Sequence, residues 1–216
     1  IKSIEIPSSF RSVREDRDAY KGIAEILLKQ QKFSKAAQYL SKIIDKKLTS
    51  DLTEIYFKRG LAYYSSKKYN YAKNDLTRAL YLSKSYGIPE NISNFNLNLY
   101  YMRGESYLNA GNYRNALNDI NKVISIDKNI KPQYYLIRSR ANYLLGAYED
   151  SISDATSSLE FIKNDEKLKS ISFITRAESH KSINNYKLAC LDYEKAYRSN
   201  KLKLNSTINS EFYKNN

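Results

Sequence analysis

The chain has 216 residues, and 42% of them are hydrophobic, so it is long and apolar enough to bury a core. Only six glycines and three prolines are present, which argues against a turn-rich all-β fold and favours long helices with short connections. The formal net charge of +13 is spread over both halves of the chain, so we interpret it mainly as solvated surface.

Cysteine content and hydropathy further narrow the class of protein and its expected compartment. The single cysteine, Cys190, excludes a disulfide framework and fits a reducing compartment, which favours an intracellular, cytoplasmic location. No run of 18 apolar residues that would span a membrane occurs, and the first ten residues do not have the shape of a signal peptide. Because the chain starts with Ile1 rather than Met, we expect a fragment or a processed form.

In chain order, residues 1–16 form an N-terminal extension, in which Ser12-x-x-Glu15 fits a capping box that opens the first helix. A repeat array then spans residues 17–204, and residues 205–216 form a weakly patterned tail. Pro132 falls at a predicted helix start, where its missing N–H costs nothing. The array divides into five predicted helix pairs, at about 17–50, 53–86, 97–130, 132–165 and 170–203.

The repeat is defined by aromatic and small residues at fixed offsets. An aromatic residue is followed three positions later by a small one in the pairs Phe33/Ala36, Tyr69/Ala72, Tyr113/Ala116, Tyr148/Ser151 and Tyr186/Ala189. Nine residues before each of these aromatics lies another small residue: Ala24, Gly60, Gly104, Ser139 and Ala177. Four residues before that small residue is again an aromatic: Tyr20, Tyr56, Tyr100, Tyr135 and Phe173.

This framework resembles the tetratricopeptide repeat family over residues from about 17 to about 200, with the best match at Tyr100, Gly104, Tyr107, Gly111 and Tyr113. The resemblance implies an all-α fold, a right-handed α-solenoid of about five antiparallel helix pairs. It also implies a non-enzymatic scaffold or adaptor that binds another protein or a peptide segment. Small residues on both helices let them approach closely, and stacked neighbours complete each apolar core.

Four repeats carry an arginine just before the small residue of the first helix, and an aspartate follows 16 residues later. The predicted ion pairs are Arg59 with Asp75, Arg103 with Asp119, Arg138 with Asp154, and Arg176 with Asp192. Repeat one has Ile23 and Tyr39 instead, so both partners are missing together. We interpret the pairs as structural, since a buried unpaired arginine would be costly.

The first helices are expected to line a concave groove, and their outward positions follow from helical spacing. The predicted groove residues are Phe57, Leu61, Tyr64, Tyr101, Glu105, Leu108, Leu136, Arg140, Tyr143, Ile174 and Glu178, with Lys21, Glu25, Leu28 and Lys181 at the ends. The middle of this set is unusually apolar for a solvated helix face, which favours binding of an extended segment or a helix. The alternative is that the tail or a neighbouring subunit covers it.

No catalytic, metal-binding or cofactor-binding motif is present, so we expect no enzyme activity and no cofactor. The single histidine, His180, occupies the position of Tyr63 and Tyr107 in other repeats and is interpreted as a packing residue. Cys190, beside Ala189, is interpreted as a small core residue.

Relatives that bind chaperone tails use a carboxylate clamp, which is not matched here. Lys21 is followed four residues later by Glu25 rather than asparagine, and Lys58 stands where a second asparagine would be. Two other functions remain open: a structural subunit of a large assembly, or a basic module for RNA or an anionic surface. We expect no specific nucleic-acid binding, because the basic residues are scattered among acids.

Overall fold

A computed structural model describes residues 12–85 and 94–200, and this part of the chain is α-helical without a β-strand. The predicted tail, residues 205–216, lies outside the described residues, as do residues 1–11 of the predicted N-terminal extension. The helices are α1 (Val13–Lys29), α2 (Phe33–Asp45), α3 (Thr53–Ser65), α4 (Tyr69–Ser85), α5 (Asn94–Asn109), α6 (Tyr113–Ile126), α7 (Pro132–Leu144), α8 (Tyr148–Phe161), α9 (Glu166–Ser182) and α10 (Tyr186–Asn200).

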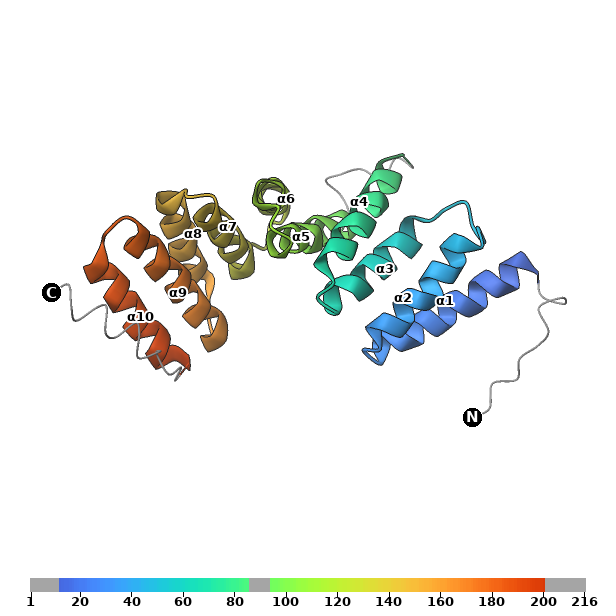
Figure 1. Cartoon of the computed structure of the whole chain (residues 1–216), viewed down its shortest axis with the longest axis horizontal. Coiled ribbons are helices and arrows are strands. Elements are labelled where there is room, and N and C mark those ends of the chain that lie inside the picture. The colour runs from blue at the N-terminus through green and yellow to red at the C-terminus, as the bar shows by residue number, and fades with distance from the viewer. Residues whose placement is uncertain (1–11, 86–93, 201–216) are drawn as a thin grey trace. The chain divides into compact units, whose positions relative to one another are not determined.

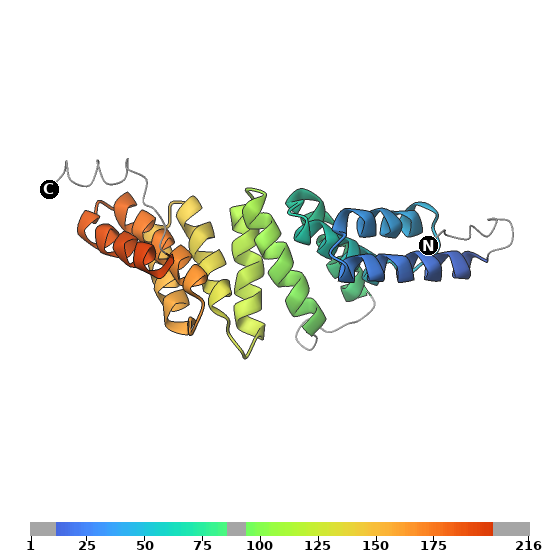
Figure 2. The ribbon, with the colours of Figure 1, turned by 90° about the horizontal axis from the view of Figure 1, so that it is seen from below.

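The chain divides into two compact units, Ile1–Ala110 and Gly111–Asn216. In the first unit, α1 packs on α2, α2 on α3, α3 on α4 and α4 on α5. In the second, α6 packs on α7, α7 on α8, α8 on α9 and α9 on α10 (Figure 1). Successive helices of each unit lie side by side in the second view as well (Figure 2). The all-α solenoid architecture predicted from the repeat pattern is confirmed.

Local signals in the sequence define several helix starts. The capping box forms at α1, where the Ser12 hydroxyl accepts the Glu15 N–H at 3.2 Å and the Glu15 carboxylate accepts the Ser12 N–H at 2.7 Å. The Asp165 carboxylate accepts the Leu168 N–H at the start of α9, and Pro132 is the first residue of α7. Because of the capping box, α1 begins at Val13, inside the segment predicted as an extension.

The turn between the two helices of a repeat has one recurrent conformation. The residue two positions before each repeat aromatic has a positive φ, between 57° and 81°: Gln31, Lys67, Gly111, Gly146 and Asn184. Where the hydrogen bonds are described, the next N–H binds a carbonyl five residues back, as from Lys68 to Tyr63 and from Ala147 to Asn142. This is the Schellman arrangement, which satisfies carbonyls at a helix end. Only two of the five positions hold the glycine that this backbone favours.

Small residues sit where helices touch. Ala24, Ala36, Gly60, Ala72, Ala177 and Ala189 are all buried. A Cβ built on Gly60 would lie 3.0 Å from the Cγ of Leu76 on α4, so the approach of α3 to α4 depends on a missing side chain.

The interface between α8 and α9 is built from serines. The Ser151 and Ser179 hydroxyls lie 2.8 Å apart, and those of Ser158 and Ser172 lie 3.0 Å apart, all four fully buried. Ser139 on α7 continues the chain of contacts by donating to the Ser151 carbonyl at 2.8 Å. Each hydroxyl therefore has a partner, which removes most of the cost of burying it.

Candidate functional site

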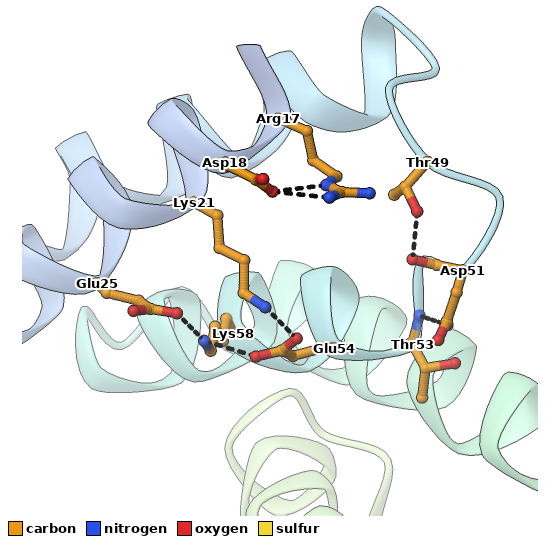
Figure 3. Close-up of polar contacts among 9 residues, drawn as sticks. All are labelled: Arg17, Asp18, Lys21, Glu25, Thr49, Asp51, Thr53, Glu54 and Lys58. Carbon is orange, nitrogen blue, oxygen red and sulfur yellow. Dashed lines mark hydrogen bonds and ion pairs between the residues drawn. The ribbon is translucent and has the colours of Figure 1, made fainter. Parts of the chain in front are cut away.

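In the N-terminal unit, the first helices of the repeats are α1, α3 and α5. The face that they form is charged at its α1 end. Lys21 on α1 contacts Glu54 on α3 at 2.6 Å, Lys58 contacts Glu54 at 2.7 Å, and Lys58 also binds Glu25 (Figure 3). Burial raises the pKa of Glu54, but its hydrogen bonds to the two lysines outweigh burial and leave the pKa lowered. The four side chains therefore neutralise one another across α1 and α3.

The middle of this face is aromatic. The rings of Phe57 on α3 and Phe95 on α5 are tilted by 59° with centroids 4.7 Å apart, a favourable aromatic geometry. Leu61 follows Phe57 by one helical turn and stays half-buried, as Phe57 does. Apolar side chains of α3 thus remain partly accessible to solvent, although the same face of the helix contacts α5.

A third cluster joins α3 to α5. The Tyr64 hydroxyl donates to the Glu105 carboxylate, and Tyr101 also interacts with Glu105. Burial, together with this carboxylate, raises the pKa of both tyrosines, so their hydroxyls stay protonated and act as donors. All three residues are half-buried. We call Tyr64, Tyr101 and Glu105 the tyrosine–glutamate cluster.

In the C-terminal unit, the corresponding face is more mixed. Arg140 is exposed and Tyr143 half-buried on α7, with the Tyr143 ring 5.8 Å from that of Tyr148. Ile174 and Glu178 on α9 are half-buried. The Tyr193 hydroxyl on α10 donates to Glu178, so this carboxylate is tied to the second helix of its own pair.

Two of the predicted groove residues are buried. Leu108 on α5 and Leu136 on α7 are only 3% and 6% exposed. Each lies on the predicted face by helical spacing, but neither offers surface to a ligand.

Arginines of the first helices bind the aspartates 16 residues later. The described pairs are Arg59 with Asp75, Arg138 with Asp154 and Arg176 with Asp192, with N–O distances of 2.6–3.0 Å. Arg103 and Asp119 belong to different units, and their pairing stays a prediction. Burial disfavours the charge of Arg59, but its hydrogen bonds to Asp75 outweigh this and raise its pKa.

Each arginine also reaches a third helix, which the sequence analysis missed. The remaining guanidinium nitrogen of Arg59 donates to Ser41, that of Arg138 to Asn121 and that of Arg176 to Thr156, at 2.9–3.0 Å. These acceptors lie on the preceding second helix, eight residues after its repeat aromatic. The polar character of that position in successive repeats is a signal that could have identified it. The arginine therefore links one repeat to the one before it.

Aromatic rings complete these arginine sites. The guanidinium carbon lies 5.4–5.6 Å from the ring centroid of the aromatic three residues earlier, in Arg59/Tyr56, Arg103/Tyr100, Arg138/Tyr135 and Arg176/Phe173. At this distance a cation is attracted to the ring face. Because an arginine bound to an aspartate and close to an aromatic ring recurs in repeats of both units, we interpret this motif as structural.

Reactive side chains are few in the described part of the chain. His180 is buried on α9, where burial lowers its pKa and no hydrogen-bond partner for Nδ1 is described. Cys190, which we expected in the core, is exposed. The equivalent residue of the first repeat, Ala37, is buried in a cluster with Ala62 of the next repeat, and no described helix follows α10. Within residues 12–85 and 94–200, no three acidic, histidine or cysteine side chains are grouped to hold a metal, and no helix is long and apolar enough to cross a membrane.

Comparison with known proteins connects this geometry to a family. Residues 53–86 and 97–130 match the family model for the tetratricopeptide repeat. These two segments are tetratricopeptide repeats. The other predicted repeats, at about 17–50, 132–165 and 170–203, share the aromatic and small positions of the two matched ones. No protein in the curated set of sequences matches the chain.

Solved structures share the tetratricopeptide fold. MamA from Desulfovibrio magneticus RS-1 (residues 41 to the end) is 15% identical with a TM-score of 0.69, over 88% of this chain and 98% of that one. The MamA MSR-1 structure is 17% identical with a TM-score of 0.68, over 86% and 97%. YrrB, described as a tetratricopeptide protein with an unusual peptide-binding site, is 16% identical with a TM-score of 0.67, over 88% and 94%. At these identities the likeness establishes the fold alone.

Proposed function

We propose that the chain is a non-enzymatic scaffold or adaptor that binds an extended segment of another protein along the faces of its first helices. Repeat arrays of this class generally use such extended surfaces for protein interaction. The observation that carries the proposal is the half-buried stripe of Phe57, Leu61 and Tyr64 on α3, continued by Tyr101 on α5. Apolar and aromatic side chains left accessible in one row are typical of a surface that another chain covers.

Five basic residues of the first helices are paired with acids, which favours a protein partner over a phosphate backbone for this face. Arg59, Arg138 and Arg176 are bound to aspartates, and Lys21 and Lys58 to glutamates. Nucleic-acid affinity rests on cations that neutralise phosphates, and these cations are already compensated within the chain.

A selection of displayed peptides against the full chain tests the proposal. We expect peptides that bind wild type to lose affinity by about tenfold or more with Leu61→Asn or Tyr64→Ser, since a few central contacts dominate such interfaces. Tyr81→Ser is the matched control, because Tyr81 lies on the second helix α4 and is 71% exposed. Equal binding by all variants, or the absence of any selected peptide, would contradict the proposal.

A structural subunit of a large assembly is a second candidate, favoured by the outer side of α10. Leu188 and Leu191 there are 42% and 43% exposed, although earlier repeats hold polar Gln38, Asn74, Asn118 and Ser153 where Leu191 lies. Sedimentation tests self-assembly of this kind. If it occurs, wild type sediments above its mass of 25.1 kDa and Leu188→Lys combined with Leu191→Lys restores the monomer. A monomeric wild type at high concentration counts against self-assembly.

A further inference from the structure

We propose that the tyrosine–glutamate cluster is a subsite for a basic side chain, above all an arginine, of the bound protein segment. The inference rests on the proposed function and names the chemistry of one part of the same face. It comes from a carboxylate that stands among aromatic rings and forms no salt bridge with a described residue.

Glu105 is held by hydroxyl donors rather than by a cation. Tyr64 donates to one carboxylate oxygen, and Tyr101 interacts with the same group. A carboxylate has about four acceptor positions, so two tyrosine donors leave it with further capacity. The hydroxyls orient the charge without cancelling it. A half-buried carboxylate in this situation gains most from an approaching cation, because its desolvation is already partly paid by the fold.

The surroundings of Glu105 suit a guanidinium better than a bare ammonium. The Tyr64 ring lies near the Tyr69 ring, edge to face, with centroids 6.4 Å apart. Tyr101 lies on α5 one turn before Glu105. A planar guanidinium can donate to the carboxylate and stack on such rings at the same time.

The chain itself contains this combination of groups with its arginine in place. Arg59 binds the Asp75 carboxylate at 2.7 Å while its guanidinium lies 5.6 Å from the Tyr56 ring centroid. Arg138 does the same between Asp154 and Tyr135. The tyrosine–glutamate cluster offers a carboxylate and tyrosine rings on a solvent-accessible face, and the bound segment would supply the cation.

The charges along the same face agree with this assignment. Its two lysines, Lys21 and Lys58, are paired with Glu25 and Glu54. Glu105 therefore adds a negative charge that no other residue of this set balances, although the whole chain carries +13. On α3, Leu61 lies about one turn before Tyr64, and Phe57, whose ring contacts Phe95, lies one turn before Leu61. A fitting segment carries an arginine close to an apolar residue.

Peptide selection on the full chain, repeated with Glu105→Gln, tests the subsite. Glutamine preserves size and can still accept from Tyr64, so folding is retained and only the charge is lost; thermal melting checks this. We expect arginine to be enriched at one position of the peptides selected on wild type. The enrichment should disappear with Glu105→Gln and persist with Glu160→Gln, the matched control on an exposed part of α8.

A labelled peptide from the selection then measures the coupling free energy between Glu105 and the arginine of the peptide. Replacing its arginine by glutamine should weaken binding to wild type by about tenfold and binding to Glu105→Gln by much less. An unchanged effect of the arginine in the Glu105→Gln variant would overturn the subsite while leaving the proposed function intact. Failure of any peptide to bind would overturn both. A wild-type dimer that Glu105→Gln dissociates would assign the cluster to a second copy of this chain, which also overturns the proposal.

Discussion

The interface between α2 and α3 and the interface between α8 and α9 use the same repeat positions but different chemistry. Ala36 and Ala62 lie in one buried cluster of the first interface, and Ile43 and Ile55 in another. The equivalent residues of the second interface are the hydrogen-bonded serine pairs Ser151–Ser179 and Ser158–Ser172. Both interfaces join consecutive repeats, within separate units.

The difference shows that a position in the interface between repeats requires a side chain of suitable volume whose polar groups are hydrogen-bonded. The side chain does not have to be apolar. An alanine pair can be replaced by two serines when one hydroxyl donates to the other and the second donates to a backbone carbonyl, as Ser172 does to Leu168 and Ser179 to Thr175, because neither is then left unsatisfied. Isoleucine at the outer pair adds buried apolar area, on the order of 2 kcal/mol per side chain, which the serine interface does not have. The α2–α3 interface should therefore respond to lost volume, and the α8–α9 interface to lost hydrogen bonds.

The largest effect on stability should come from placing the serine of the α8–α9 interface at the isoleucine position of the α2–α3 interface. Ile43→Ser removes a fully buried side chain from the α2–α3 cluster and should lower the free energy of unfolding by about 4 kcal/mol. Ser158→Ala should lower it by only about 1 kcal/mol, because Ser172 keeps its bond to the Leu168 carbonyl at 3.0 Å. Urea unfolding of the two variants measures the contrast. Equal losses would refute the distinction between the interfaces.

The arginine sites should behave alike in both units. Asp75→Ala and Asp192→Ala each leave a mostly buried guanidinium without its carboxylate, and each should destabilise its unit by about 3 kcal/mol. Amide hydrogen exchange resolves the loss helix by helix and should report it in the preceding repeat too, since Arg59 also binds Ser41. Asp45→Ala, at an exposed residue of α2, serves as the control and should change little.

Two glycines of the N-terminal unit should respond to alanine with opposite signs. A Cβ at Gly22 meets nothing within 4 Å, so Gly22→Ala should raise stability by about 1 kcal/mol through helix propensity. At Gly60 the Cβ would press on Leu76, and the overpacking should outweigh propensity for a net loss of about 1 kcal/mol. Thermal melts of both proteins decide the point. A stabilised Gly60→Ala would mean that α3 and α4 separate easily.

The turns within the repeats should show the smallest effect. Lys67 has φ of 59° and Gly146 has φ of 81°, so the same left-handed conformation is strained in the first turn and relaxed in the second. Lys67→Gly should raise the free energy of unfolding by about 0.5 kcal/mol, and Gly146→Ala should lower it by about 1 kcal/mol. Chemical denaturation of the pair measures both signs, and a destabilised Lys67→Gly would contradict the strain.

The sequence by itself determined the helix pairs and their register. Aromatic and small residues at constant offsets predict which helix faces meet, because close approach needs a small side chain and the gaps need large ones. The spacing of 16 residues between arginine and aspartate likewise predicts that the two face each other across a pair. Helical periodicity is a local property, so it can be read along the chain without knowing the fold.

Only the tertiary structure decided which residues of those faces stay accessible and what each polar group binds. Helical spacing places Leu108 and Leu136 on the same predicted face as Leu61, yet both are buried. The third partner of each arginine and the bond from Tyr64 to Glu105 join residues 17 to 41 positions apart on different helices. Such contacts depend on how neighbouring helices cross and which side chains fill the space between them. Periodicity assigns a side chain to a face, but burial and hydrogen bonding depend on what the next helix places opposite it.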